Sequence, residues 1–430
     1  MKILFEGWFN IPHSYAIVMC SQLAALRKLY PSLEIFIYER KYFMSNWQPM
    51  ALNRIYPPDY CEILSSFPVL DPHSISLDDI DAIYRATYPY DIERPANYQG
   101  PIFVFFTAEF RNLDHNFFCL GDKGAGSAGT AEEIRERLAS DPRIHLIAPS
   151  TWSAEGLRAF LGTAHDVTII PHGVDMDIYH PLCREAALTA LGRDADVFEK
   201  IPPDSVVMAN FGAMTPNKGL VHIFEAMHIL INHQNNDKYR LVLKGTRDLY
   251  RSSDFVSGIA GRLCRSLTKE QERRLFDHIV FIDSTLSAEQ MCALYSLADV
   301  YVCPYLAEGF SITPLEALAC GCKVVLPRTG STEDYVKVLP ADSFRLVRSE
   351  VIAIPPQNCL YVNKIDVADL VKVLGKISGN IRSEAGISRR RILGELEKYY
   401  SWKAAAKQLL DKIKEIVTSE ATSKTPMLPP

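Results

Sequence analysis

Two carboxylates and a run of main-chain amides share one short segment, Glu308-Gly-Phe-Ser-Ile-Thr-Pro-Leu-Glu316, with seven residues between the glutamates. Pro314 suits the first position of a helix and Gly321 suits its end, so the loop leads into a helix. Amides at a helix N-terminus favour anions and hydroxyl oxygens. The amides that we expect to face such a ligand are those of Phe310, Ser311 and Ile312.

Glu316 also has a purely structural explanation. Thr313 and Glu316 have the spacing of a capping box, in which two side chains close the start of a helix. Glu308 has no such explanation, because it stands between an apolar strand pattern at Tyr301–Pro304 and a glycine. Both interpretations of Glu316 are open at this point, whereas Glu308 is a candidate for chemistry.

A lysine follows another apolar run, in Asn210-Phe-Gly212-Ala-Met-Thr-Pro-Asn-Lys218-Gly219. A lysine at the start of a helix is more often exposed than functional. Here it follows a buried strand and precedes glycine, so its ammonium can reach a diphosphate at the end of the sheet.

The N-terminal half offers weaker candidates. The loop from Gly7 to Tyr15 follows the first strand pattern and opens a helix, and it includes His13 as a possible ligand or catalytic group. Ser14 is the residue that we expect to cap this helix. Glu109 follows a strand pattern at the sheet edge where α/β sites form, with a solvated or salt-bridged carboxylate as the competing interpretation.

The elements that must position these residues alternate as in parallel α/β layers. The predicted strands are Lys2–Phe5, Ile35–Tyr38, Ala82–Arg85, Ile102–Phe106, Leu146–Ala148, Ser205–Phe211, Tyr239–Lys244, His278–Ile282, Val300–Cys303 and Lys323–Leu326. The predicted helices include Tyr15–Leu29, Ala131–Ala139, Ser153–Phe160 and Ser401–Ile416. A chain of 430 residues favours two domains, with the boundary between Pro171 and Pro203.

Taken with its flanks, the carboxylate segment resembles the Glu-x7-Glu motif of retaining GT-B glycosyltransferases of the family-4 type. Further segments fall where that family has equivalents, closely over residues 140–415 and loosely before them. These segments are Val167-Thr-Ile-Ile-Pro171-His-Gly173-Val-Asp175, Tyr179-His-Pro181, Asn210–Gly219, Leu241-Val-Leu-Lys-Gly245, Ala298-Asp-Val-Tyr-Val-Cys-Pro304, Gly330-Ser-Thr-Glu-Asp334 and Ser401-Trp402.

The resemblance implies two Rossmann-like domains facing across a cleft, with the last helix crossing back to the first domain. The implied bounds are an acceptor-side domain 1–183 with the returning helix 401–418, a donor domain 184–400 and a disordered tail 419–430. The resemblance also implies a hexosyltransferase that uses a UDP- or GDP-linked sugar and an acceptor hydroxyl on a glycan, a lipid or a small molecule.

The resemblance further assigns roles. Glu308 would face the transferred sugar, Glu316 the ribose and Lys218 the diphosphate. The implied donor-binding residues are Lys218, Glu308, Phe310, Ser311, Ile312, Thr313, Glu316, Gly7 and Gly212. The implied catalytic residues are Glu308, Lys218, Glu109 and His13. The leaving phosphate would take the acceptor proton, so neither a protein nucleophile nor a metal or other cofactor is needed.

Two departures from the family pattern bear on the donor site. Ser311 stands where the family commonly has glycine, and Ala213 stands where it usually has a phosphate-binding arginine. Either Lys244 or Arg247 replaces that arginine, or donor affinity is lower. The Ala213 departure supports an alternative, a catalytically weak scaffold that binds a nucleotide sugar. A sugar phosphorylase or an epimerase of the same fold is a further alternative.

Composition excludes several other classes. The net charge of −5 gives no general field for nucleic acid, and no apolar run approaches a membrane span, so any membrane contact is expected to be peripheral. The ten cysteines form neither a redox nor a zinc pattern. DxD triplets such as Asp175-Met-Asp177 lack the context of a metal site. We therefore expect a cytoplasmic, metal-independent enzyme.

Overall fold

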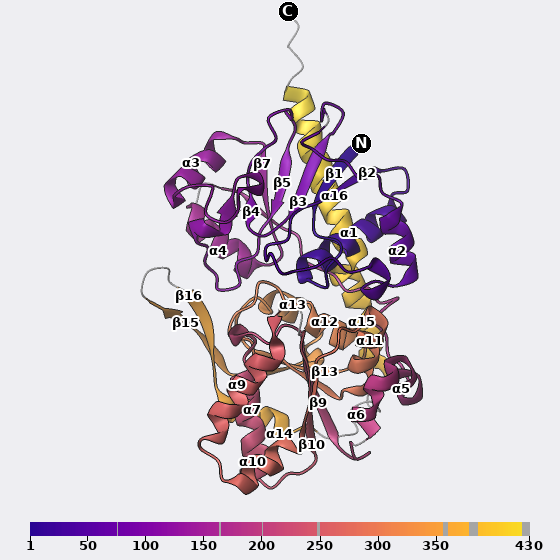
Figure 1. The fold of residues 1–430 in the computed structure, drawn as a ribbon, viewed down its shortest axis with the longest axis vertical. Helices are drawn as coiled ribbons and strands as arrows, with labels where there is room; N and C mark the ends of the chain where they lie inside the picture. The colour runs from indigo at the N-terminus through magenta and orange to yellow at the C-terminus, as the bar shows by residue number, and fades with distance from the viewer. Residues whose placement is uncertain are drawn as a thin grey trace, which may run out of the picture. The chain divides into compact units, whose positions relative to one another are not determined.

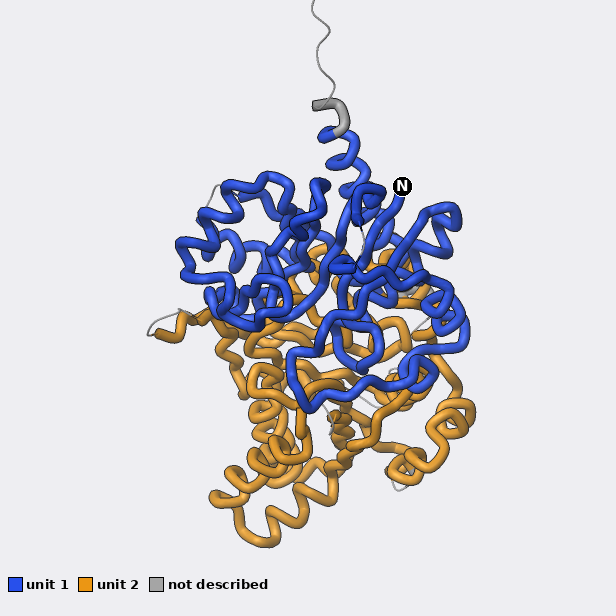
Figure 2. Tube along the Cα trace, turned by 45° about the horizontal axis from the view of Figure 1, so that its top comes forward, with its two compact units in different colours: residues 1–173, 402–430 blue, residues 174–401 orange. Residues whose placement is uncertain are grey.

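A computed structural model describes the chain except for a few short stretches. The chain folds into two compact units. The residues outside the description are 75, 163–164, 200, 247–249, 356–359, 378–385 and 424–430. Unit 1 consists of Met1–Gly173 and of the chain from Trp402 onward, and unit 2 is the continuous segment Val174–Ser401 (Figure 2). The polypeptide therefore passes from unit 1 into unit 2 and back again.

Unit 1 is built on a six-stranded parallel sheet in the order β2-β1-β3-β5-β7-β8. Its strands are β1 (Lys2–Gly7), β2 (Glu34–Glu39), β3 (Ala82–Ala86), β5 (Ile102–Phe105), β7 (Ile144–Ala148) and β8 (Val167–Ile169). A single bridge from Ile37 to Val69 adds the start of a further strand beside β2. Ile3, Leu4 and Phe5 are fully buried, as expected for a strand that is covered on both faces.

Helices cover this sheet, and the last helix of the chain is one of them (Figure 1). The helices of unit 1 are α1 (Ser14–Leu29), α2 (Pro58–Ser65), α3 (Ala131–Ser140), α4 (Thr151–Leu161) and α16 (Trp402–Ser423). The short strands β4 (Tyr90–Asp91) and β6 (Phe118–Cys119) pair outside the main sheet. Helix α16 packs on α1 through buried residues at helical spacing, Ala405, Ala406, Leu409, Leu410 and Ile413.

Unit 2 has a second six-stranded parallel sheet, in the order β11-β10-β9-β12-β13-β14. Its strands are β9 (Val206–Phe211), β10 (Tyr239–Lys244), β11 (Ile279–Ile282), β12 (Val300–Val302), β13 (Lys323–Pro327) and β14 (Phe344–Val347). This is the strand order of the dinucleotide-binding fold, and the order reverses between β9 and β12.

The sheet of unit 2 carries helices on both faces and a separate hairpin (Figure 1). The helices are α5 (Arg184–Leu191), α6 (Asp196–Glu199), α7 (Leu220–His228), α9 (Ser252–Cys264), α10 (Lys269–Phe276), α11 (Ala288–Leu297), α12 (Thr313–Ala319), α13 (Glu333–Val338), α14 (Val367–Gly375) and α15 (Gly386–Tyr400). Helix α7 continues into a π-helical turn, Ile229–His233. The antiparallel hairpin pairs β15 (Ser349–Ile354) with β16 (Leu360–Ile365).

All ten predicted strands are present with ends within two residues, but the predicted domain boundary at 183 and 184 differs from the division in the structure. The contacts divide the chain after Gly173, because the next residues are bonded within unit 2. The N–H of Val174 donates to the carbonyl of Tyr400 at 2.8 Å, and the N–H of Leu182 donates to Ser296 Oγ at 3.0 Å. The acceptor-side and donor-side roles of the domains stay predictions.

The prediction of a disordered tail over 419–430 is wrong for its first part. Helix α16 extends to Ser423, and residues 424–430 lie outside the described residues. Over the described part of the chain, no helix combines the length and the apolar character needed to cross a membrane.

Candidate active site

The candidate site of unit 2 lies at the point where the strand order reverses. Parallel α/β sheets bind ligands outside the carboxyl ends of their strands at such a point. The chain leaves β9 at Gly212, whose φ of 125° suits glycine and whose N–H donates to the carbonyl of Lys244 at 2.9 Å. It leaves β12 at Cys303. The two loops that follow carry Lys218 and Glu308.

Gly219 allows these two loops to touch. It follows a short 3-10 turn, Pro216–Lys218, with a φ of 72°, in the left-handed region that favours glycine. A Cβ atom at Gly219 would also collide with the carbonyl oxygen of Pro304. Both facts require glycine at this position, and they place Lys218 against the loop after β12.

Lys218 and Glu308 form an ion pair between these loops. The Lys218 side chain is 21% exposed and the Glu308 side chain 10%, so the pair lies at the surface of unit 2 but is mostly shielded from water. The Lys218 ammonium also lies 5.5 Å from the centre of the Tyr305 ring, within the range of a cation–π contact. The structure therefore brings together the two residues that the sequence singled out from distant segments.

The predicted amide loop contains a strained residue. Ser311 has a φ of 71°, a conformation that serine rarely adopts and glycine adopts freely. The Phe310 side chain belongs to the core, where its ring packs 6.0 Å from Tyr335 and 6.2 Å from Tyr400 between ring centres. Only the main chain of Phe310 is thus available to a ligand.

Thr313 and Glu316 do not form a capping box, so that alternative is wrong. The helix N-cap is Ile312, which places Thr313 at the first helical position and Glu316 one residue too far along for the motif. Thr313 Oγ1 is instead 2.9 Å from the hydroxyl of Tyr305. The side chain of Glu316 points to other partners.

Glu316 is a buried carboxyl group held by tyrosines. The Tyr295 hydroxyl donates to Glu316 Oε2 at 2.7 Å, and the buried Tyr179 lies close to the same carboxyl group. Burial raises the pKa of Glu316 to about 7, while the two tyrosines act in the opposite direction. A carboxyl group with this pKa can change charge near neutral pH when a ligand arrives.

Lys244 is a second basic residue of unit 2 next to the site. It ends β10, beside the last residue of β9 in the sheet register, and it is 8% exposed. Burial lowers the pKa of Lys244 to about 8, and Asp283 acts in the opposite direction. Arg247, the other predicted replacement for the missing arginine, lies outside the described residues.

In unit 1, Gly7 ends β1 and His13 caps α1. A Cβ atom at Gly7 would lie 2.7 Å from Met19 Cε and 3.1 Å from the carbonyl oxygen of Ala86, so packing alone explains the glycine. His13 Nδ1 accepts the N–H of Tyr15 at 3.1 Å, which makes His13 the N-cap and the predicted cap at Ser14 wrong.

His13 is neutral at physiological pH. Its ring lies 5.0 Å from Trp8 and 5.2 Å from Trp47 between ring centres, and burial lowers the pKa of His13 to about 3. Glu109 is exposed after β5, and its carbonyl accepts the indole N–H of Trp152 at 2.8 Å. The catalytic roles of His13 and Glu109, and the donor contact of Gly7, stay predictions.

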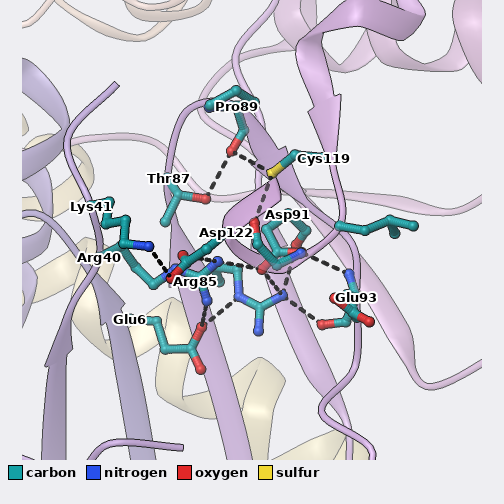
Figure 3. Close-up of polar contacts among 12 residues, drawn as sticks. Glu6, Arg40, Lys41, Arg85, Thr87, Pro89, Asp91, Glu93, Cys119 and Asp122 are labelled. Atoms are coloured by element: carbon teal, nitrogen blue, oxygen red, sulfur yellow. Dashed lines mark hydrogen bonds and ion pairs between the residues drawn. The ribbon is translucent and has the colours of Figure 1, made fainter. Parts of the chain in front are cut away.

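Sequence reasoning missed a buried charge cluster in unit 1 (Figure 3). Glu6 Oε2 accepts from Arg85 Nε at 2.7 Å and from Arg40 at 3.1 Å, and Asp91 Oδ2 lies 2.6 Å from Arg40 and 3.1 Å from Arg85. Burial disfavours the charge on Arg85, but the carboxylates of Asp91 and Glu6 outweigh it and raise the pKa of Arg85. The one feature of the sequence that pointed to this cluster is Glu6, a charged residue inside an otherwise apolar strand.

This cluster lies where β1, β2 and β3 end and their order reverses in the sheet of unit 1. Its charges pair with one another, with Asp122 3.5 Å from Arg40 at the margin. The cluster therefore ties the ends of β1 and β3 to the start of the loop after β2 and to β4, at the edge where α/β sites form. Over the described ranges, we find no group of three or more metal-ligating side chains.

Comparison with known proteins places most of unit 2 in a sequence family. Residues 193–339 match the sequence family described as "Glycosyl transferases group 1", and this range contains Gly212, Lys218, Glu308 and Glu316 but not Gly7, His13 or Glu109. D-inositol 3-phosphate glycosyltransferase of Saccharomonospora viridis is 26% identical over 307 residues, which is 68% of this chain and 62% of that protein. Alpha-maltose-1-phosphate synthase of Mycobacterium tuberculosis is 27% identical over 173 residues, 40% of this chain and 39% of that protein. The matches thus span less than two thirds of these relatives.

Solved structures share the fold over nearly the whole chain. Sucrose-phosphate synthase of Thermosynechococcus elongatus has a TM-score of 0.63 at 16% identity, covering 97% of this chain and all of that one. HepE of Anabaena, solved with UDP-glucose, has a TM-score of 0.60 at 12% identity, covering 96% of this chain and all of that one. Two parallel α/β units with the last helix in the first define the GT-B class. Within a chain of this class, residues 193–339 of unit 2 match the group 1 glycosyltransferases.

Proposed function

We propose that this protein is a retaining glycosyltransferase that moves a hexose from a UDP- or GDP-linked donor to a hydroxyl group of its acceptor. The observation that carries the proposal is the Lys218–Glu308 pair at the reversal point of a dinucleotide-type sheet. A cation that binds phosphate and a carboxylate that faces the sugar are the two charges that glycosyl transfer from such a donor needs.

In the proposed reaction, a phosphate oxygen of the bound donor replaces the Glu308 carboxylate as the ion-pair partner of the Lys218 ammonium. The bond between the anomeric carbon and that phosphate breaks, and its electron pair stays on the phosphate oxygen. Lys218 stabilises this negative charge, while the Glu308 carboxylate supports the positive charge at the anomeric carbon. The acceptor oxygen forms the new bond on the same face, and its proton passes to the departing phosphate.

We assign the nucleoside side of the donor to Glu316. An ionised carboxylate accepts hydrogen bonds from a ribose, while the Tyr295 hydroxyl keeps the carboxylate in place at 2.7 Å. Because the pKa of Glu316 is about 7 without ligand, ribose hydroxyls that donate to the carboxylate would lower it.

The names of the relatives support the choice of substrates to test. HepE was solved with UDP-glucose, and trehalose-phosphate synthase of Burkholderia xenovorans is described as UDP-forming. Several names include a phosphorylated sugar or polyol, such as inositol 3-phosphate and maltose 1-phosphate. UDP-glucose is therefore the first donor to test, and GDP-linked hexoses follow. Phosphorylated sugars and inositols lead the acceptor panel, followed by glycans and lipids.

The test is a thermal-shift screen of nucleotide sugars, followed by measurement of nucleoside diphosphate release with each acceptor in the presence of EDTA. Release that depends on an acceptor, and an α-linked product from an α-linked donor, support the proposal. An inverted product overturns the retaining assignment, and lost activity in EDTA overturns metal independence. Turnover only with inorganic phosphate, or an epimerised sugar, identifies the phosphorylase or the epimerase.

One observation favours a second candidate, a scaffold that binds nucleotide sugars without turning them over. Ala213 supplies no charge where the family usually has an arginine, so the diphosphate has one cation fewer. Binding of UDP or GDP with no release from any donor across the acceptor panel would establish the scaffold. Turnover above the rate of a Glu308→Gln variant would exclude it.

A further inference from the structure

The loop that carries Glu308 is held by two buried asparagines from different parts of unit 2. Asn217 comes from the turn before α7 and is 7% exposed, and Asn363 comes from β16 and is 3% exposed. Both bond to the main chain of Tyr305–Ala307, directly before Glu308. Neither asparagine has a charge or a nucleophile to offer, so their contribution is to geometry.

Asn217 makes hydrogen bonds to the loop through both its main chain and its side chain. Its carbonyl accepts the N–H of Leu306 at 2.8 Å and that of Ala307 at 3.3 Å, and its Nδ2 donates to the carbonyl of Ala307 at 3.0 Å. Asn217 Oδ1 accepts the hydroxyl of Thr215 at 2.6 Å, which fixes the amide orientation. Asn217 precedes Lys218 as Ala307 precedes Glu308, so these bonds act one or two residues away from the ion pair.

Asn363 holds the same loop from the hairpin. Its N–H donates to the carbonyl of Leu306 at 2.7 Å, and its Nδ2 donates to the carbonyl of Tyr305 at 3.1 Å. Asn363 Oδ1 accepts the hydroxyl of Thr329 at 2.8 Å. A Cβ atom at Gly330 would lie 2.7 Å from Asn363 Nδ2, so this glycine leaves room for the amide.

We propose that Asn217 and Asn363 are positioning residues that hold the Glu308 carboxylate beside Lys218, in the place where it meets the donor sugar. This inference rests on the proposed function, because it requires Glu308 to act on the donor sugar. Together the two asparagines satisfy three main-chain groups on one side of the loop and two on the other. A catalytic group that shifts by about 1 Å can lose about a hundredfold in rate, so such ties matter.

The first test measures the loop itself by amide hydrogen exchange. Asn217→Asp and Asn363→Asp keep the side-chain shape and the acceptor for the threonine, but turn the amide donor that faces a carbonyl into an acceptor. Asn232→Asp is the matched control, because Asn232 Nδ2 likewise donates to a carbonyl, that of Gln271 at 3.1 Å, elsewhere in unit 2. We expect faster exchange at Leu306–Glu308 in the two test variants and not in the control.

The second test asks whether the asparagines act through Glu308. With the donor that the panel identifies at saturation, we expect Asn217→Asp to lower kcat about 10- to 100-fold. In the double variant with Glu308→Gln, the asparagine change should cost little more, because the group that it positions is already disabled. If the reduction in kcat of the double variant equals the product of the two single reductions, the asparagine change acts independently of Glu308, and the inference is overturned.

The outcomes separate this inference from the proposed function. Wild-type turnover in Glu308→Gln alone would refute the role of Glu308 itself, whatever the loop does. A slow Glu308→Gln together with wild-type exchange and turnover in both asparagine variants would refute only the positioning role. If a buried aspartate unfolds unit 2, Asn217→Ala and Asn363→Ala remove the same amide bonds without adding charge, and their results decide in the same way.

Discussion

The phenolic hydroxyl of Tyr295 donates to the carboxylate of Glu316 at 2.7 Å, in a place where burial raises the pKa of that carboxylate to about 7. Tyr295 lies on α11 and Glu316 on α12, so the bond joins two helices. The property of Glu316 that calls for a test is therefore its charge, since it does not cap a helix.

The raised pKa of Glu316 predicts a pH dependence of stability. Between its ordinary pKa of 4.5 and about 7, the folded protein holds a proton that the unfolded chain has lost. The free energy of unfolding therefore falls as pH rises through this window. Glu316→Gln lacks the titration, so it should be more stable than the wild type at pH 8 by up to about 3 kcal/mol, and closer to it at pH 5.

Chemical denaturation of both proteins at pH 5 and pH 8 measures this difference, and UDP or GDP binding by calorimetry measures the functional cost. We expect Glu316→Gln to bind the nucleotide more weakly, because the amide accepts ribose hydroxyls less strongly than a carboxylate. A variant that gains stability and keeps its nucleotide affinity would remove Glu316 from the ribose site.

Lys218→Ala should weaken nucleoside diphosphate binding about 10- to 100-fold, because a hydrogen bond to a charged group contributes about 1.5–3 kcal/mol. The lost partner also leaves the Glu308 carboxylate, 10% exposed, to repel the phosphate. Lys218→Arg keeps the charge and serves as the control. Unchanged UDP and GDP affinity in Lys218→Ala would place the phosphate elsewhere.

Lys244→Met should raise stability and lower nucleotide affinity together. Burial lowers the pKa of Lys244 from 10.5 to about 8. Below pH 8 the folded protein holds a buried charged ammonium, which lowers the free energy of unfolding. This loss of stability is relieved as pH rises from 8 toward 10.5, because the folded protein then releases the proton before the unfolded chain does. Methionine has a similar length and no charge, so thermal unfolding at pH 7 should shift upward. If Lys244 replaces the missing arginine, binding weakens in the same variant. A gain in stability with unchanged binding would assign Lys244 no part in the donor site.

Ser311 should accept glycine and reject a β-branched residue. At a φ of 71°, Ser311→Gly relieves a backbone conformation that costs about 1 kcal/mol, whereas Ser311→Val raises that cost. We expect turnover and stability to stay near the wild type in Ser311→Gly and to fall in Ser311→Val. Equal behaviour of the two variants in thermal unfolding would show that the φ of this residue is not a constraint.

The strands of both sheets and the meeting of Lys218 with Glu308 could be predicted, because both depend on local patterns. Apolar runs such as Tyr239–Lys244 are covered on both faces, so their strands follow from composition alone. Lys218 and Glu308 each end a strand-to-loop pattern, and parallel strands deliver such loops to one edge of a sheet.

Several side-chain contacts and the domain boundary could not be predicted, because they depend on residues far apart in the chain. Glu6 pairs with Arg40 and Arg85, which lie 34 and 79 residues away, and Tyr295 reaches Glu316 from another helix. The capping box failed because the helix begins at Thr313 itself, one position earlier than the motif requires. The domain boundary was misplaced because Val174 bonds to Tyr400, a residue that the sequence places more than half the chain away.

Helix α16 covers α1, yet all of Val174–Ser401 separates it from the rest of unit 1. During translation the ribosome must therefore make the whole of unit 2 before the partner of α1 exists. The part of α1 that contacts α16 in the finished protein is therefore without this cover while unit 2 is being made. Unit 1 is consequently the unit whose synthesis starts first and whose packing is completed only after unit 2 has been made.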